Sequence, residues 1–117
     1  MIYTSYFSSH KYSPDLGVSI SRWNNFWTGP VFLELAPSST LLAWWKSLPK
    51  DVQKSAGAQL QYTTAYKAEV LDKLNPQDVY NFLDGKVLLC FEKSTDFCHR
   101  HLVTKWFNDA GFECEEL

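Results

Sequence analysis

A thiol, an imidazole and a guanidinium occupy three consecutive positions in this chain, at Cys98, His99 and Arg100. A cysteine in the first turn of a helix has a lowered pKa, and a nearby imidazolium lowers it further, which is how nucleophilic thiols are prepared. Adjacent helical residues point about 100° apart, so these neighbours need not touch. The motif therefore predicts either a thiol- or histidine-dependent enzyme acting on a nucleotide or nucleobase, or a small buried thiol beside a hydrogen-bonded histidine.

A metal site is a second hypothesis, because the cysteines and two histidines gather in the last third of the sequence. The candidate ligands are Cys90, Cys98, His99, His101 and Cys114. Structural zinc sites usually show closely paired ligands, and this chain has no Cys-x-x-Cys pair. An odd number of cysteines without such pairs is typical of a reducing compartment. The sequence therefore predicts free thiols, no metal and no cofactor.

Binding of a small anion is a third hypothesis. Arg100 and the free N–H groups of a helix N-terminus would hold the negative charge, and Arg22 would supply a second cation. Trp23 or Tyr6 would stack on a base, since every base offers a π-face. The sequence has no Walker loop and no Gly-x-Gly-x-x-Gly, so this site would be built from scattered residues. The predicted ligand-binding set is Tyr6, Arg22, Trp23, Cys98, His99 and Arg100.

A carboxylate is the last chemical candidate. Glu92 follows an apolar run directly, at a position where catalytic acids often lie, whereas Glu34, Asp96 and Asp109 have no evident partner. Glu92 is therefore a catalytic candidate beside Cys98 and His99, although one carboxylate is weak support for acid–base chemistry.

The elements that would position these residues begin with a buried strand. Residues 87–91, Val-Leu-Leu-Cys-Phe, follow Gly85 and form a short apolar run typical of a strand buried on both faces. The segment 94–96, Ser-Thr-Asp, then predicts an N-cap and an acidic first turn, and Gly111 suits the position after the helix. The first helical turn would lie near the carboxyl end of the strand, where open α/β sheets bind ligands.

The remaining pattern alternates strands and helices. Strands are predicted at 2–7, 18–21, 31–35 and 112–117, and helices at 37–48, 51–56, 58–74 and 75–85. Strand, helix and strand after residue 86 form a βαβ unit, which is parallel and right-handed. We therefore expect a single three-layer α/β domain over residues 1–117, with a small, mostly parallel sheet flanked by helices.

Composition narrows the function classes. The 117 residues carry a formal charge of −2, so no general basic field indicates nucleic acid, although a nucleic-acid-associated module remains a further alternative. Aromatic residues make up 16 %, which is a high share, so some of the rings must be core and others are available to a ligand. No apolar run reaches the length of a membrane span, and the first residues resemble a strand rather than a signal peptide. These features predict a cytoplasmic protein that meets no membrane, and they leave a homodimer open.

Several motifs together resemble those of the domain of unknown function 488 family. The late motif is a hydrophobic strand ending in Cys-Phe-Glu at 90–92, followed by the Cys-His-Arg helix start at 98–100. Tyr-Thr-Ser at 3–5, Val-Ser-Ile-Ser-Arg at 18–22 and Leu-Ala-Pro-Ser at 35–38 are similar too, as are Tyr62, Tyr66 and the Val-Leu pair at 70–71. The resemblance spans nearly the whole chain, and the late motif is specific.

The resemblance implies a compact α/β domain whose activity is unsettled, with Cys90, Glu92, Cys98, His99 and Arg100 as motif residues and Arg22 from the earlier piece. We expect a small-ligand-binding domain that holds a nucleotide-like or other phosphate-bearing molecule at the carboxyl edge of the sheet. Sequestration of a nucleotide signal, for instance in phage–host conflict, is a speculation that no residue carries.

Overall fold

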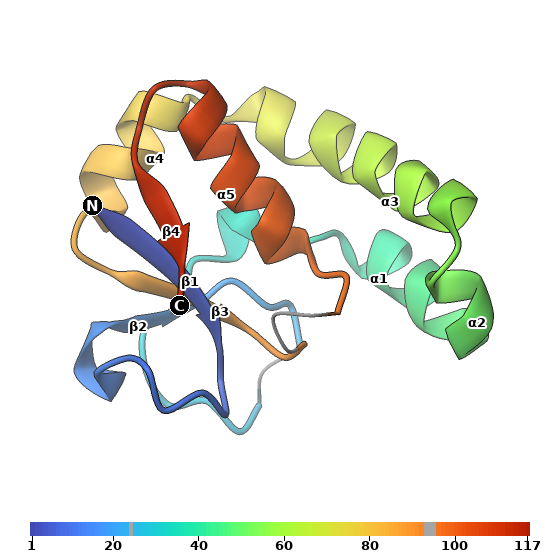
Figure 1. Cartoon of the computed structure of the whole chain (residues 1–117), viewed down its shortest axis with the longest axis horizontal. Helices are drawn as coiled ribbons and strands as arrows, with labels where there is room; N and C mark the ends of the chain where they lie inside the picture. The colour runs from blue at the N-terminus through green and yellow to red at the C-terminus, as the bar shows by residue number, and fades with distance from the viewer. Residues whose placement is uncertain (24, 93–95) are drawn as a thin grey trace.

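The computed structural model describes residues 1–23, 25–92 and 96–117, and within them the chain forms one parallel sheet. Figure 1 shows its four strands, β1 (Ile2–Tyr6), β2 (Gly17–Ser19), β3 (Val87–Cys90) and β4 (Cys114–Glu116). Their order across the sheet is β2-β3-β1-β4. β3 therefore has a neighbour on each side, as the apolar pattern at 87–91 predicts.

All four residues of β3 are buried, and the strand ends at Cys90 rather than at Phe91, whose side chain is 47 % exposed. Gly85 precedes the strand with a φ of +84°, a conformation that favours glycine. In the register with β1, Cys90 lies beside Tyr6. The ends of β1 and β3 thus meet at one edge of the sheet.

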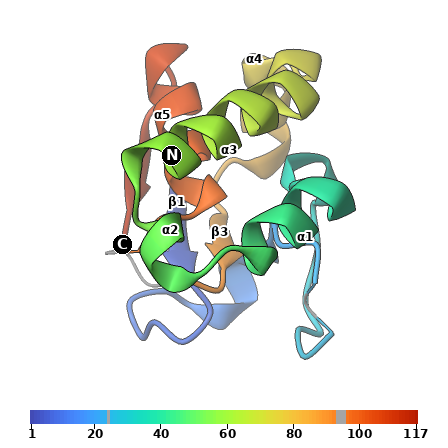
Figure 2. The same ribbon diagram turned by 90° about the vertical axis from the view of Figure 1, so that its right-hand side faces the viewer.

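The helices follow the caps in the sequence. They are α1 (Ser39–Ser47), α2 (Lys50–Gln53), α3 (Ala56–Glu69), α4 (Pro76–Leu83) and α5 (His99–Asp109), with short 3-10 helices η1 (Pro14–Leu16), η2 (Leu33–Leu35) and η3 (Leu71–Lys73). Ser38, Ser55 and Asn75 each accept a backbone N–H at the start of a helix. In Figure 2, α1, α2 and α3 lie in front of the sheet as a helical projection. None of the helices in the described ranges is long and apolar enough to cross a membrane.

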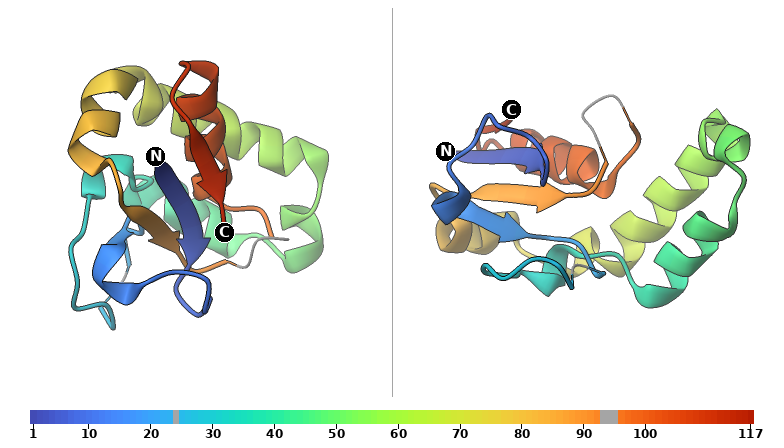
Figure 3. Two further views of the ribbon diagram at one scale, coloured as in Figure 1. Left: turned by 60° about the vertical axis from the view of Figure 1, so that its left-hand side comes forward. Right: turned by 90° about the horizontal axis from the view of Figure 1, so that it is seen from below.

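The layers follow from the handedness of the crossovers. The connections from β2 to β3 and from β3 to β4 move across the sheet in one direction, and the connection from β1 to β2 moves in the other. Right-handed crossovers then place the five α-helices on one face and the β1–β2 connection, with η1, on the opposite face. The left view of Figure 3 shows the α-helices behind the strands and η1 in front of them. The predicted small α/β domain is confirmed, and the layer that contains η1 is thin.

Side chains confirm which face is which. The hydroxyl oxygens of Thr4 on β1 and Thr104 on α5 are 3.0 Å apart, so Thr4 faces the helices. On the other face, a Cβ at Gly17 would lie 2.8 Å from Leu89 and 3.0 Å from the Trp27 ring. Trp27 therefore closes the thin layer over the sheet.

The start of α5 differs from the sequence prediction. Cys98 is the N-cap, with extended backbone angles, and His99 and Arg100 form the first turn. The predicted caps at residues 94 and 95 lie outside the described residues, and Asp96 precedes the helix, so an acidic first turn is wrong. The predicted end is correct, because Gly111 follows the helix with a φ of +87°.

Two other predicted elements are shorter or different. Residues 31–35 form an isolated bridge, between Val31 and Ser19, followed by η2 instead of a strand. The helix predicted to Leu74 ends at Glu69, because Val70 leaves the regular helical conformation and η3 follows.

Candidate functional site

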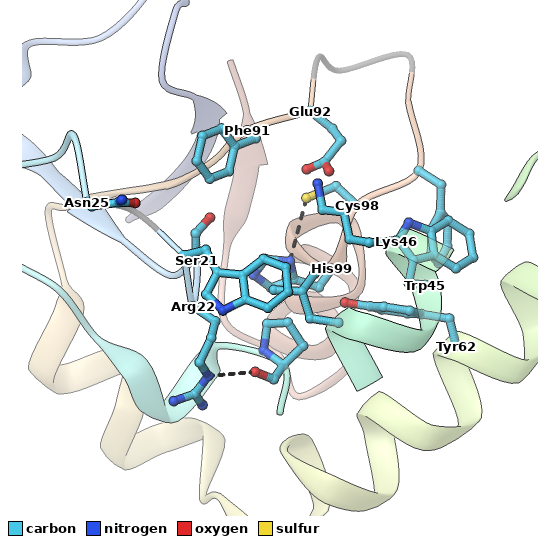
Figure 4. Close-up of a pocket in the computed structure, with 14 residues that line it drawn as sticks. Ser21, Arg22, Asn25, Trp45, Lys46, Tyr62, Phe91, Glu92, Cys98 and His99 are labelled. Atoms are coloured by element: carbon cyan, nitrogen blue, oxygen red, sulfur yellow. Dashed lines mark hydrogen bonds between the residues drawn. The ribbon is translucent and has the colours of Figure 1, made fainter. Parts of the chain in front are cut away.

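A cavity of about 310 Å³ opens at the carboxyl edge of the sheet (Figure 4). Its lining comes from the segments that follow β2 and β3, from α1 and α3, and from the start of α5. We call it the aromatic cavity, and its lining residues are Ser21, Arg22, Trp23, Asn25, Pro37, Leu42, Trp45, Lys46, Tyr62, Phe91, Glu92, Phe97, Cys98 and His99. Its position matches the expectation from parallel strands, whose carboxyl ends share one edge.

Three packed rings form one wall of the aromatic cavity. The ring centroids of Trp45 on α1 and Tyr62 on α3 are 5.2 Å apart, and Phe97 lies 5.1 Å from Trp45 and 5.3 Å from Tyr62. These are separations at which aromatic pairs attract. Trp45 and Tyr62 are buried, so the wall is part of the core and is formed before any ligand arrives.

His99 is fixed by its backbone partner. Its Nε2 lies 2.7 Å from the carbonyl oxygen of Ile20, and because a carbonyl only accepts, Nε2 carries the proton. Burial lowers the pKa of His99 to about 4, and the charges of Arg100 and His101 act in the same direction. The imidazole is therefore neutral near pH 7, with an unprotonated Nδ1 3.6 Å from the Sγ of Cys98.

Two cysteines meet at the bottom of the aromatic cavity. Cys90 and Cys98 form a disulfide in the structure, and Cys114 is the free one of the three described cysteines. The prediction of free thiols is therefore wrong for this pair, because the odd cysteine count and the lack of a Cys-x-x-Cys pair do not reveal that the end of β3 and the N-cap of α5 bring the two sulfurs together. Cys98 lines the cavity, whereas Cys90 lies beneath it in β3.

Arg100 and Tyr6 lie apart from the aromatic cavity and contact each other. The guanidinium carbon of Arg100 is 5.7 Å from the centroid of the Tyr6 ring. Nη1 donates to the Sγ of Cys90 at 3.1 Å and to the backbone carbonyl of Glu92, and Nε lies 3.8 Å from a carboxylate oxygen of Glu116. This fully buried arginine therefore joins the ends of the strands. The sequence predicts Arg100 in the wall of the ligand site, but the structure places it outside the lining of the aromatic cavity.

Arg22 and Trp23 do line the aromatic cavity. The Nε of Arg22 donates to the carbonyl of Pro37 at 2.9 Å, which ties the segment after β2 to the start of α1. The Trp23 ring is 46 % exposed and so offers a face to a ligand at modest cost. Four of the six predicted ligand residues, including Cys98 and His99, are thus brought together.

A second cavity, of about 360 Å³, adjoins the first. We call it the lysine cavity, and its lining residues are Trp45, Lys46, Lys50, Gln53, Lys54, Gln59, Glu92, Asp96 and Phe97. Four of them, Trp45, Lys46, Glu92 and Phe97, also line the aromatic cavity. Glu92, the predicted catalytic carboxylate, therefore lies at the border between the two cavities, and Figure 4 shows it pointing toward Cys98 and Lys46.

The other proposed metal ligands lie elsewhere. His101 contacts a carboxylate oxygen of Glu116 through Nδ1 and the carbonyl of Asp96 through Nε2. The Sγ of Cys114 lies 3.9 Å from the hydroxyl of Thr104. Neither side chain belongs to the cluster formed by Cys90, Cys98 and His99.

The family model DUF488-N3a, described as the active DUF488-N3 subclade, matches residues 12–111. The chain belongs to the DUF488 family. The match includes the Cys-His-Arg motif and every residue that lines the two cavities. No curated protein and no solved structure matches the chain.

Sequence reasoning missed most of the walls of this DUF488 site. The sequence indicates Trp45 and Tyr62 as apolar positions of helices, and Tyr62 also as part of the family resemblance, but it assigns neither residue, nor the lysines of α1 and α2, to the site. A usable signal is the ring of Phe97 directly before Cys98, since a large aromatic ring next to a candidate site residue is a natural wall for a ligand site. The lysine cavity had a signal as well, because Lys46, Lys50 and Lys54 recur at intervals of four.

Proposed function

We propose that this domain binds a small ligand that carries a flat ring and an anionic group, most simply a nucleotide. The observation that carries the proposal is the junction of an aromatic cavity with a lysine cavity through four shared residues. Small-molecule sites are concave and mostly apolar, with a few polar groups that fix orientation.

The aromatic cavity suits the ring. The packed wall of Trp45, Tyr62 and Phe97 supplies rigid apolar surface, and Trp23 faces the same space from the segment after β2. Stacking of a base on an aromatic side chain contributes about 1–3 kcal/mol and tolerates different bases. A volume of about 310 Å³ is at the small end of the range for such sites, so a single base with its sugar fits the proposal better than a large cofactor.

The lysine cavity suits the anionic group. Lys46, Lys50 and Lys54 line it together with two carboxylates, Glu92 and Asp96, so cations outnumber anions. Lysine binds phosphate as a point charge, without the fixed geometry of arginine. The carboxylates are suited to accept hydrogen bonds from sugar hydroxyls or from an exocyclic amine between the two cavities.

The test is a thermal-shift panel of nucleoside 5′-phosphates on wild type and on Lys50→Ala/Lys54→Ala. A ligand at a hundredfold excess over its dissociation constant stabilises the wild type by about 2.7 kcal/mol. The double variant should lose most of that shift. The control, Lys73→Ala/Lys105→Ala, removes the same charge from exposed positions that line neither cavity, and it should respond like the wild type.

A panel without any shift would contradict the ligand class. Equal shifts in both double variants would show that the charge of α2 is not part of the site. Arg100 is a predicted anion-binding residue, but Arg100→Ala is a poor probe because this side chain holds the strand ends.

A thiol-dependent enzyme is the second candidate, and the approach of the Cys98 Sγ to the unprotonated Nδ1 of His99 favours it. The family description of an active subclade agrees with an enzyme but names no reaction. Against it, burial makes His99 a weak base, which disfavours an imidazolium–thiolate pair near neutral pH. Chromatography of nucleotides recovered from reduced protein separates the two candidates, because a binder returns them unchanged.

A further inference from the structure

Three potential metal ligands converge at the bottom of the aromatic cavity. The Sγ atoms of Cys90 and Cys98 and a ring nitrogen of His99 all lie within 4.8 Å of one another, and all three residues are buried. They come from the end of β3 and the start of α5, so their spacing in the sequence does not match a typical zinc motif.

We propose that the reduced protein binds one zinc ion through Cys90, Cys98 and His99. Two thiolates and an imidazole bind zinc in preference to magnesium and calcium, because these two harder ions prefer oxygen ligands. Zn–S and Zn–N bonds of about 2.3 and 2.0 Å at a tetrahedral angle separate a sulfur from a nitrogen by about 3.5 Å. The Sγ of Cys98 and the Nδ1 of His99 are 3.6 Å apart.

The hydrogen bonds around the cluster suit this role. A zinc-binding histidine donates its other ring N–H to a carbonyl or carboxylate, which fixes the ring and the tautomer. His99 donates Nε2–H to the carbonyl of Ile20 at 2.7 Å, leaving the lone pair of Nδ1 for the metal. Arg100 donates to the Sγ of Cys90 at 3.1 Å, and a thiolate accepts such a bond better than a thiol does.

The fourth coordination position would face the aromatic cavity. Cys98 and His99 line that cavity, whereas Cys90, which is buried at the end of β3, does not. Zinc sites with three protein ligands keep the fourth position for water or substrate. An oxygen or nitrogen atom of a bound molecule would occupy it, and the Glu92 carboxylate points toward the same space (Figure 4).

The disulfide and the metal are alternative states of the same sulfur atoms. In the structure the two sulfurs are joined across Cα atoms 7.6 Å apart, a separation beyond the usual disulfide range of about 4.4–6.8 Å, and reduction frees both sulfurs for a metal ion. Two separate Zn–S bonds span this distance more easily. The site is therefore tested on fully reduced protein, and it depends on no assumption about the organic ligand.

The experiment titrates reduced, metal-free protein with Zn²⁺ alone against a chromophoric chelator, and separately with Co²⁺ as a spectroscopic probe. We expect one Zn²⁺ per chain with an affinity of about nanomolar or tighter. The Co²⁺ form should show intense sulfur-to-metal charge transfer and the d–d bands of a tetrahedral site.

The decisive comparison is Cys98→Ser against Cys114→Ser. Serine is a favoured N-cap, so Cys98→Ser should keep α5 intact and still weaken zinc binding at least a hundredfold. Cys114→Ser removes a buried thiol outside the cluster and should bind like the wild type. Circular dichroism checks that both variants fold, and the Co²⁺ spectrum of the wild type tests the ligand set without any substitution.

The proposal is wrong if reduced wild type binds no stoichiometric zinc, or if Cys114→Ser weakens binding as much as Cys98→Ser. A Co²⁺ spectrum without sulfur charge transfer would also overturn it, because the metal would then lie on other ligands.

Discussion

The neighbours of His99 determine the protonation state and the tautomer of its ring. The ring is buried, stacks edge-on at 5.6 Å against Tyr66, and donates to the carbonyl of Ile20. An imidazolium in this place would lose its hydration, and the positive charge of Arg100, the next residue, would repel it. The residue therefore serves as a neutral acceptor at Nδ1, which is what either a thiol partner or a metal ion requires.

This neutral state predicts a loss of stability in acid. The pKa of His99 is about 4 when folded and about 6.5 when unfolded, so the unfolded chain binds the proton more readily between these values. The free energy of unfolding of metal-free protein should fall by up to about 3 kcal/mol as the pH drops from 6.5 toward 4. Urea denaturation of wild type and His99→Gln across this range measures the difference.

The variant His99→Gln should lack that part of the pH dependence, while His10→Gln, at an exposed position, should retain it. Parallel curves for wild type and His99→Gln would mean that the imidazole is already accessible to protons in the folded protein.

The elements position the site through close contacts at the edge of the sheet. β2 is short and starts at Gly17, where a Cβ would press against Leu89 and Trp27. The phenol of Tyr66 on α3 donates to the carbonyl of Leu35 at 2.5 Å, which holds η2 against the helix. Ser21 and Arg22, which line the aromatic cavity, therefore lie between β2 and η2, both of which are held by close packing.

Gly17→Ala should destabilise the fold, because a Cβ there would meet Leu89 at 2.8 Å and the Trp27 ring at 3.0 Å. Overpacking of this kind costs about 1–3 kcal/mol. The matched control is Gly57→Ala in α3, where a Cβ meets nothing within 4 Å. It should be neutral or stabilise by up to about 1 kcal/mol, since alanine favours helices.

Thermal or chemical denaturation of the two alanine variants measures both effects. Equal stability of Gly17→Ala and Gly57→Ala would show that the thin layer over the sheet yields freely, and that the start of β2 is not fixed by packing.

Local patterns predicted these elements well where the signal was local. The apolar run at 87–91 and the caps at Ser38, Asn75 and Gly111 specify their elements within a few residues. The start of α5 was missed because cysteine is an unusual N-cap, and the preceding Ser-Thr-Asp looked stronger.

At the scale of the whole molecule, the location of the site was predictable and its composition was not. Parallel strands share a carboxyl edge, so Arg22, Trp23, Cys98 and His99 were expected to meet there. The packing of α1 and α3 against the start of α5 brings in Trp45 and Tyr62, and that packing depends on contacts between distant segments which no local pattern encodes.

The same argument explains Arg100. Its position in the first turn of α5 was nearly correct, but the aim of its side chain depends on the register of β1, β3 and β4. In the fold the guanidinium lies at the ends of the strands, where it contacts the ring of Tyr6 and the carboxylate of Glu116. The sequence alone therefore places Arg100 at the carboxyl edge of the sheet, but it does not reveal whether the side chain points into the ligand site or away from it.

Indole N–H resonances of the tryptophans, followed by NMR during titration with nucleoside 5′-monophosphates, test the central claim most directly. Trp23 and Trp45 line the aromatic cavity, whereas Trp106 on α5 lines neither cavity and serves as an internal reference. Trp23→Phe, Trp45→Phe and Trp106→Phe assign the three signals. We predict saturable shifts of the Trp23 and Trp45 resonances with an unmoved Trp106. Shifts of Trp106 of the same size, or no saturable shift with any nucleotide, would contradict a nucleotide site in this cavity.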